Sequence, residues 1–130
     1  MKRIVVCDDE LHILEGLRHL LRGPDRKIVI GHSGVDALEQ VRQEVPDLLI
    51  IDIMMPKMDG IQAVATLREQ EETRHLPIII LTAKGHARDV AMVQEVWNVR
   101  VMAKPFEPAK LRQLVAEILE TEPCTVPSSN

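Results

Sequence analysis

Five short apolar runs alternate with five segments of helical periodicity along the chain, and this alternation limits the folds available to it. The strands that these runs predict cover residues 2–7, 27–31, 48–52, 76–83 and 99–103. Apolar residues recur every three or four positions in the segments between and after them, at 10–22, 35–44, 60–71, 86–97 and 107–119. Strands that alternate with helices in this way pair in parallel through right-handed crossovers. The sequence therefore predicts one α/β domain with helices on both faces of a parallel sheet.

Composition supports a single core and argues against nucleic-acid binding. The 130 residues are 45% hydrophobic and 28% charged, which is ordinary for a globular chain. Trp97 and Phe106 are the only aromatic residues, so nucleic-acid bases would find almost no surface on which to stack. The net charge of −4 is opposite in sign to that of a typical nucleic-acid-binding domain. We therefore expect no direct contact between this domain and nucleic acid.

The two ends of the chain suggest where the protein works. The apolar run at 2–7 is too short for a signal peptide or a membrane span. Cys7 and Cys124 show neither a disulfide framework nor metal-ligand spacing. Residues 122–130, EPCTVPSSN, hold too few apolar side chains to pack. We expect a cytoplasmic protein with no membrane association, a folded domain over 1–121, and a flexible tail or linker stump over 122–130.

Charged and hydroxyl side chains stand where four of the predicted strands end: Asp8, Asp9, Asp52, Thr82 and Lys104. A doubly wound sheet binds ligands at the carboxyl ends of its strands, where the strand order reverses. With the flavodoxin-like (βα)5 order 2-1-3-4-5, the first and third strands are neighbours at this reversal. The three aspartates are therefore expected at one edge of the sheet.

Each of these residues has an ordinary interpretation when it is taken alone. An aspartate after a strand is most often a helix N-cap, Thr82 would bond the backbone, and Lys104 would be a surface charge. Together they are harder to dismiss, because two carboxylates about 5 Å apart repel by roughly 3 kcal/mol at an effective dielectric of about 20. Three carboxylates need a cation, and oxygen ligands without His or Cys favour Mg²⁺, which commonly shares a phosphate. A carboxylate such as Asp52 can itself accept that phosphoryl group.

Four segments, VVCDDE, LLIIDIMMPKMDG, PIIILTA and MAKPFEP, resemble the receiver domain of two-component response regulators in order and spacing. The resemblance covers nearly the whole chain, from about residue 2 to about residue 120. It implies that Asp52 accepts a phosphoryl group from a phosphohistidine of a histidine kinase or phosphotransfer protein. Thr82 and Lys104 would contact that group, and the peptide bond before Pro105 would be cis.

The resemblance also implies a set of magnesium ligands. Asp9 and Asp52 would bind Mg²⁺ directly, Asp8 would bind it through water, and Met54 would contribute its backbone carbonyl.

A signalling switch, and not a metabolic enzyme, is the function that the resemblance implies. Phosphorylation would shift the threonine and alter the face built by the fourth helix, the fifth strand and the fifth helix. That face would control a downstream protein or a fused output domain, and a phosphorylation-linked homodimer is compatible with it. Two residues depart from the family pattern: Val101 stands where Tyr or Phe is usual, and Trp97 stands where Gly is usual.

Two other interpretations compete with the switch. An enzyme of the haloacid dehalogenase class also phosphorylates an aspartate after a strand, but it needs a second acid two residues later, where this chain has Met54. A pseudo-receiver would keep the fold and bind partners without phosphotransfer. Val101 and Trp97 leave that alternative open, whereas the complete set of site residues argues against it.

Overall fold

The computed structural model describes residues 2–53, 60–83, 94, 98–104 and 106–120. Strands and helices alternate there in the predicted order. The strands are β1 (Lys2–Cys7), β2 (Arg26–Gly31), β3 (Leu48–Asp52), β4 (Ile78–Ala83) and β5 (Arg100–Lys104). The helices are α1 (Leu11–Leu21), α2 (Gly34–Gln43), α3 (Gly60–Glu69) and α5 (Pro108–Glu120). The predicted helix at 86–97 and the predicted tail at 122–130 lie outside the described residues, apart from residue 94.

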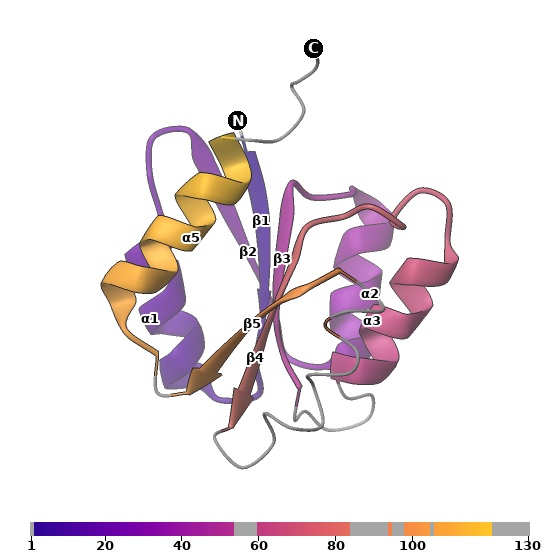
Figure 1. Cartoon of the computed structure of the whole chain (residues 1–130), viewed down its shortest axis with the longest axis horizontal. Helices are drawn as coiled ribbons and strands as arrows, with labels where there is room; N and C mark the ends of the chain where they lie inside the picture. The colour runs from indigo at the N-terminus through magenta and orange to yellow at the C-terminus, as the bar shows by residue number, and fades with distance from the viewer. Residues whose placement is uncertain (1, 54–59, 84–93, 95–97, 105, 121–130) are drawn as a thin grey trace.

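The five strands form one parallel sheet in the order β2-β1-β3-β4-β5, which confirms the predicted flavodoxin-like topology. Cys7 at the end of β1 lies opposite Ile51, so Asp8 follows β1 beside Asp52 at the end of β3. Asp52 in turn lies opposite Leu81 of β4. All strands therefore finish at one edge of the sheet, which is the lower edge in Figure 1.

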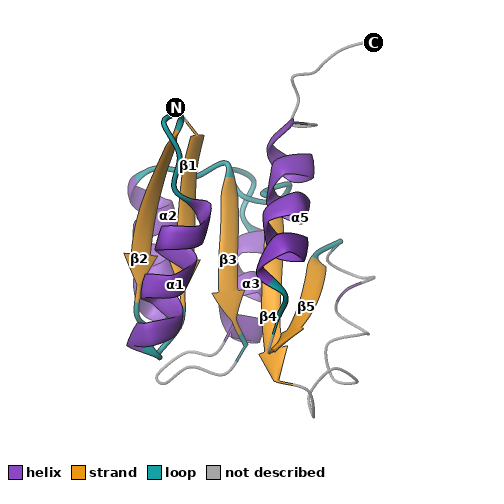
Figure 2. Cartoon of the chain, turned by 90° about the vertical axis from the view of Figure 1, so that its left-hand side faces the viewer, coloured by secondary structure: helices purple, strands orange, loops and turns teal. Residues whose placement is uncertain are grey.

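Helices cover both faces of the sheet, with α1 and α5 on one side and α2 and α3 on the other (Figures 1 and 2). Successive side chains of a strand point to opposite faces, so each central strand contributes to two cores. In β3, Leu49 and Ile51 pack with α2 and α3. Leu48 and Ile50 pack with α1 and α5. Burial on both faces explains why this strand is apolar without alternation.

The predicted helix boundaries are wrong by one or two residues at several ends. Helix α1 begins at Leu11 because Glu10 has extended backbone angles and precedes the helix. Helix α3 ends at Glu69 because Gln70 N–H already bonds the carbonyl of Leu67, a tighter turn than that of an α-helix. None of the helices in the described part of the chain has the length and apolar character needed to cross a lipid bilayer.

A buried arginine ties the beginning of the sheet to the end of α2. The side chain of Arg3 donates hydrogen bonds to the backbone carbonyls of Gln40 and Glu44, at the carboxyl end of the helix. Its backbone N–H donates to Asp47 Oδ2 at 2.9 Å. A positive charge at a helix carboxyl end is favourable because it meets the partial negative charge of the last carbonyls. Arg3 therefore fixes the connection that leads from α2 into β3.

Cys7 is fully buried at the end of β1, directly before Asp8. Burial, and after it the nearby charge of Asp36, raises the pKa of the Cys7 thiol to about 12. The thiolate is the reactive form of cysteine, so Cys7 is an inert core side chain at neutral pH.

This pKa predicts a pH-dependent loss of stability in alkali. In the unfolded chain the thiol ionises near its ordinary pKa, whereas the folded thiol stays protonated, so the unfolded state gains stability as the pH rises from about 9 toward about 12. Between pH 8 and pH 10 the free energy of unfolding should fall by about 1 kcal/mol more in the native chain than in Cys7→Ala. Urea unfolding at both pH values measures the difference, and Cys124 is common to both chains. Equal pH slopes in the two chains would contradict a protonated Cys7.

Candidate functional site

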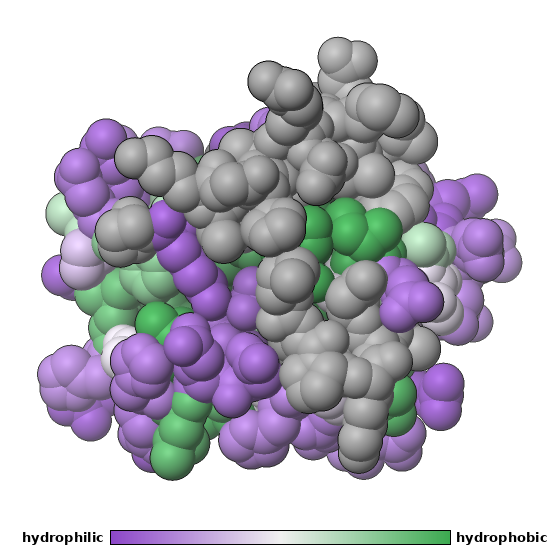
Figure 3. All heavy atoms as spheres, turned by 90° about the horizontal axis from the view of Figure 1, so that it is seen from below, coloured by the Kyte–Doolittle hydropathy of each residue, from purple (hydrophilic) through white to green (hydrophobic). Residues whose placement is uncertain are grey.

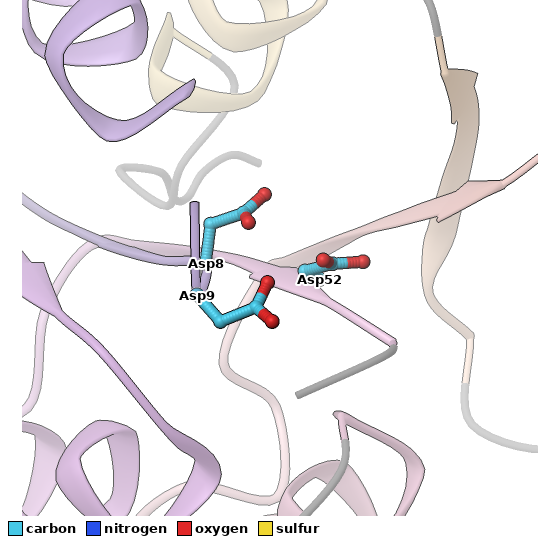
Figure 4. Close-up of side chains that lie close together, drawn as sticks. All are labelled: Asp8, Asp9 and Asp52. Atoms are coloured by element: carbon cyan, nitrogen blue, oxygen red, sulfur yellow. The ribbon is translucent and has the colours of Figure 1, made fainter. Parts of the chain in front are cut away.

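Three aspartates meet at the edge of the sheet where the strands end. Asp8 and Asp9 follow β1, and Asp52 is the last residue of β3. Each offers one carboxylate oxygen, and these oxygens all lie within 4.8 Å of one another. Figure 4 shows the three carboxyl groups side by side, and Figure 3 shows that hydrophilic side chains gather at this end of the molecule. The structure therefore brings together the three carboxylates that we expected, from the sequence, at one edge of the sheet.

The fold holds these carboxylates at different depths. Asp8 and Asp52 are buried, with exposed fractions of 0% and 4%, whereas Asp9 is exposed. The backbone N–H of Glu10 donates to Asp8 Oδ1 at 2.9 Å. This bond from two residues later is a local turn, so Asp8 does not act as the N-cap of α1. Its carboxylate is instead turned toward β3 and β5.

Lys104 supplies the positive charge, from the end of β5. Its Nζ lies 2.9 Å from Asp8 Oδ2 and 3.1 Å from Asp52 Oδ2. Burial by itself lowers the pKa of Lys104, but the hydrogen bonds to Asp8 and Asp52 and their charges outweigh it, so the pKa of Lys104 lies above its ordinary value. The ammonium group therefore remains charged at neutral pH and partly neutralises the two buried acids.

The remaining predicted residues differ in what the structure shows. Thr82 is fully buried in β4, the strand between β3 and β5. It follows Leu81, which lies opposite Asp52, and it lies opposite Ala103, the residue before Lys104. Thr82 therefore lies between the strands of Asp52 and Lys104, within one residue of the level of each. Met54 and Pro105 lie outside the described residues, so their predicted roles stay predictions.

The structure adds two residues to which the sequence had given no role. The Oε1 atom of Glu10 lies 3.8 Å from Lys104 Nζ. Gly60, the first residue of α3, donates its N–H to the carbonyl of Ile53 at 3.0 Å. A Cβ atom on Gly60 would lie 2.5 Å from the carbonyl oxygen of Asp52 and 2.8 Å from the Cα of Ile53. The pattern of apolar residues in the sequence gave no indication of this close approach of α3 to the end of β3.

The chemistry of the donor set fits a hard divalent cation. All three candidate ligands offer carboxylate oxygens, and neither His nor Cys belongs to the cluster. Mg²⁺ prefers such oxygens and binds with one or two carboxylates while it keeps several waters. Asp8, Asp9 and Asp52 are the described residues that could hold it.

Comparison with known families agrees with this geometry. The family model described as the response regulator receiver domain matches residues 4–116. The chain belongs to this family. Receiver domains are the parts of two-component response regulators that take part in phosphorylation-dependent signalling, and the fold and the acidic edge described above are those of such a domain.

Named relatives lie within the same family. The chain is 35% identical over 128 residues to the alkaline phosphatase synthesis transcriptional regulatory protein PhoP of Bacillus subtilis, covering 98% of this chain and 52% of that protein. It is 34% identical over 118 residues to the transcriptional regulatory protein CpxR of Escherichia coli K12, covering 91% of this chain and 48% of that protein. This receiver domain therefore spans about half the length of the curated relatives it matches.

Solved receiver domains have the same architecture. The signal receiver domain of a signal transduction histidine kinase from Syntrophus aciditrophicus superposes with a TM-score of 0.85 at 27% identity, covering all of this chain and 98% of that chain. The receiver domain of AraT, a response regulator from Geobacillus stearothermophilus, gives a TM-score of 0.81 at 27% identity, covering 92% and 93% of the two chains. The receiver fold therefore extends over the whole described sheet.

Proposed function

We propose that this receiver domain accepts a phosphoryl group on Asp52 from the phosphohistidine of a histidine kinase or phosphotransfer protein, in a Mg²⁺-dependent reaction. The observation that carries the proposal is the contact of Lys104 Nζ with both Asp52 Oδ2 and Asp8 Oδ2, beside a third carboxylate. A buried acid that ends a strand at the reversal of the sheet, with a cation on one side and further acids on the other, is suited to phosphoryl transfer.

The residues of the site would divide the work. Asp52 is the nucleophile: one of its carboxylate oxygens bonds to phosphorus, the bond between phosphorus and the donor nitrogen breaks, and its electron pair returns to the imidazole. A carboxylate needs no general base for this step. Lys104 and the Thr82 hydroxyl would donate hydrogen bonds to the phosphoryl oxygens, where negative charge must be stabilised. Water attack on the acyl phosphate would later reset Asp52.

The metal would be held by Asp9 and Asp52, with Asp8 beside them and the carbonyl of Met54 as a further ligand. When bound, Mg²⁺ would neutralise charge on the carboxylates and on the phosphoryl oxygens. The domain changes only its own phosphorylation state, so we class it as a switch and not as an enzyme that acts on a metabolite.

The output of the switch would be a change of the face that includes β5 and α5; the predicted fourth helix of that face, at 86–97, lies outside the described residues apart from residue 94. Val101 of β5 is half-buried and packs against the core on the side of α2 and α3. An aromatic side chain is usual in the family at this position, so here the movement would pass through Thr82 and Lys104 without an aromatic partner at residue 101. The target would be a downstream protein or a fused output domain, and the transfer would take place in the cytoplasm, where ATP-dependent kinases work.

Incubation with acetyl phosphate tests the proposal. Intact mass spectrometry should show a gain of one phosphoryl group when Mg²⁺ is present and none in EDTA, because the acidic cluster repels an anionic donor until a divalent cation is bound. Hydroxylamine, which cleaves acyl phosphates, should remove the gained mass.

A folded chain that gains no phosphoryl group under these conditions, and shows no spectral change with beryllofluoride and Mg²⁺, would contradict the proposal. That result would favour a pseudo-receiver that signals by binding partners alone.

A further inference from the structure

Glu10 contacts both Asp8 and Lys104, the oppositely charged residues at the centre of the site. Its backbone N–H holds Asp8 Oδ1 at 2.9 Å. Its side-chain Oε1 lies 3.8 Å from Lys104 Nζ, and the side chain is 52% exposed. The carboxylate of Glu10 is thus within reach of the lysine but free to change its rotamer, in contrast to the buried carboxylates of Asp8 and Asp52.

Lys104 holds oxygens that a divalent cation would need. Its ammonium group contacts Oδ2 of Asp8 and Oδ2 of Asp52, and Asp8 Oδ1 already accepts the Glu10 N–H. An ammonium group and a divalent cation repel each other, and they would compete for the same carboxylates. Metal binding at Asp9 and Asp52, beside Asp8, would therefore favour the release of at least one of these Lys104 contacts.

We propose that Glu10 is a positioning residue that receives the Lys104 ammonium group when a divalent cation binds the cluster of Asp8, Asp9 and Asp52. This inference rests on the proposed function, since it needs the acidic cluster to bind Mg²⁺. Lys104 Nζ already lies 3.8 Å from Glu10 Oε1, and the Glu10 side chain is 52% exposed, so a change of its rotamer could bring the two groups into contact. Because Glu10 would then pair with the ammonium group of Lys104, the lysine would stay close enough to donate a hydrogen bond to an incoming phosphoryl group.

The inference predicts that the effect of Glu10 on metal affinity depends on Lys104. In Glu10→Gln the lysine loses its alternative partner and remains on Asp8 and Asp52, so the Kd for Mg²⁺ should rise about fivefold. In Lys104→Met there is no competing ammonium group, and adding Glu10→Gln to that background should change the Kd by less than about twofold. Such a double-mutant cycle separates an action through Lys104 from a general electrostatic effect, which would weaken binding equally in both backgrounds.

Titration of the four chains with MgCl₂ in metal-free buffer, followed by amide chemical shifts or calorimetry, measures each Kd without reference to phosphorylation. Glu15→Gln is the matched control, because Glu15 lies on the exposed face of α1 and pairs with Arg18 at 3.1 Å. It should leave the Kd unchanged. Thermal unfolding in EDTA checks that each variant is folded, and Glu10→Asp, which keeps the charge on a shorter side chain, should fall between the native chain and Glu10→Gln.

The possible failures are distinguishable. A native chain that binds no Mg²⁺ would overturn the proposed function itself. A native chain that binds Mg²⁺ with the same Kd as Glu10→Gln would overturn only the role of Glu10. An equal loss of affinity from Glu10→Gln in the native and Lys104→Met backgrounds would also overturn it, because Glu10 would then act without Lys104.

Discussion

Asp52→Asn is expected to abolish the gain of a phosphoryl group from acetyl phosphate and Mg²⁺ while leaving the domain folded. Asparagine has nearly the shape of aspartate, but its amide is not a nucleophile toward phosphorus. The substitution removes one of three repelling carboxylates, and Lys104 keeps its contact with Asp8 at 2.9 Å. We therefore expect the free energy of unfolding to stay within about 1 kcal/mol of the native value. Intact mass and urea unfolding measure the two effects separately.

Asp25→Asn is the matched control for this substitution. Asp25 is exposed and lies at the other end of the sheet, where its carbonyl accepts the backbone N–H of Lys2. This variant should gain the phosphoryl group at the native rate. Undiminished phosphorylation of Asp52→Asn would place the acceptor on another side chain, and Asp9, the exposed acid of the cluster, would be the next residue to replace.

Gly60→Ala is expected to destabilise the domain by about 3 kcal/mol and to slow phosphorylation by about tenfold to a hundredfold. The added Cβ would overlap the backbone of Asp52 and Ile53, with the shortest distance 2.5 Å to the carbonyl oxygen of Asp52. Because a backbone atom cannot rotate away as a side chain can, α3 or the end of β3 must move. Either movement displaces Asp52 relative to Lys104. Urea unfolding measures the first effect, and the time course of mass gain measures the second.

Gly16→Ala is the contrasting substitution, because it is expected to raise the stability of the domain and not to lower it. Gly16 lies in the middle of α1, and a Cβ there would meet nothing within 4 Å. Alanine should therefore stabilise the domain by roughly 0.5 to 1 kcal/mol through its higher helix propensity. Phosphorylation should be unaffected. A Gly60→Ala chain with native stability and a native rate would show that the end of β3 accommodates the methyl group without moving Asp52.

The alternation of strands and helices could be predicted from sequence because it depends on short-range patterns, and the acidic cluster followed once a strand order was assumed. Apolar runs without alternation, such as residues 48–51, indicate strands covered on both faces. Once the strand order is assumed, the residue that ends each strand is placed at a common edge without any knowledge of side-chain packing. Asp8, Asp9 and Asp52 needed nothing more, and their cluster was confirmed.

Contacts that depend on packing in three dimensions could not be predicted in this way. The separation of Glu10 from Lys104 depends on the rotamers of two long side chains from opposite ends of the sequence. The contact of Gly60 with Asp52 depends on how closely α3 approaches β3. The link from Arg3 to the end of α2 depends on a buried hydrogen-bonding geometry that gives no periodic signal. Helix ends were also misplaced, since they are set by single turns.

The order in which the chain contributes to the sheet has a consequence for folding kinetics. β1, β2 and β3 all come from the first 52 residues, and they carry all three aspartates of the site, whereas Lys104 arrives with β5, the last strand of the sheet. Any folding route that pairs β1 with β3 before β5 joins them must assemble three carboxylates without this cation. Electrostatic repulsion then contributes to the folding barrier, and a divalent cation that binds the carboxylates should accelerate folding as well as stabilise the finished site.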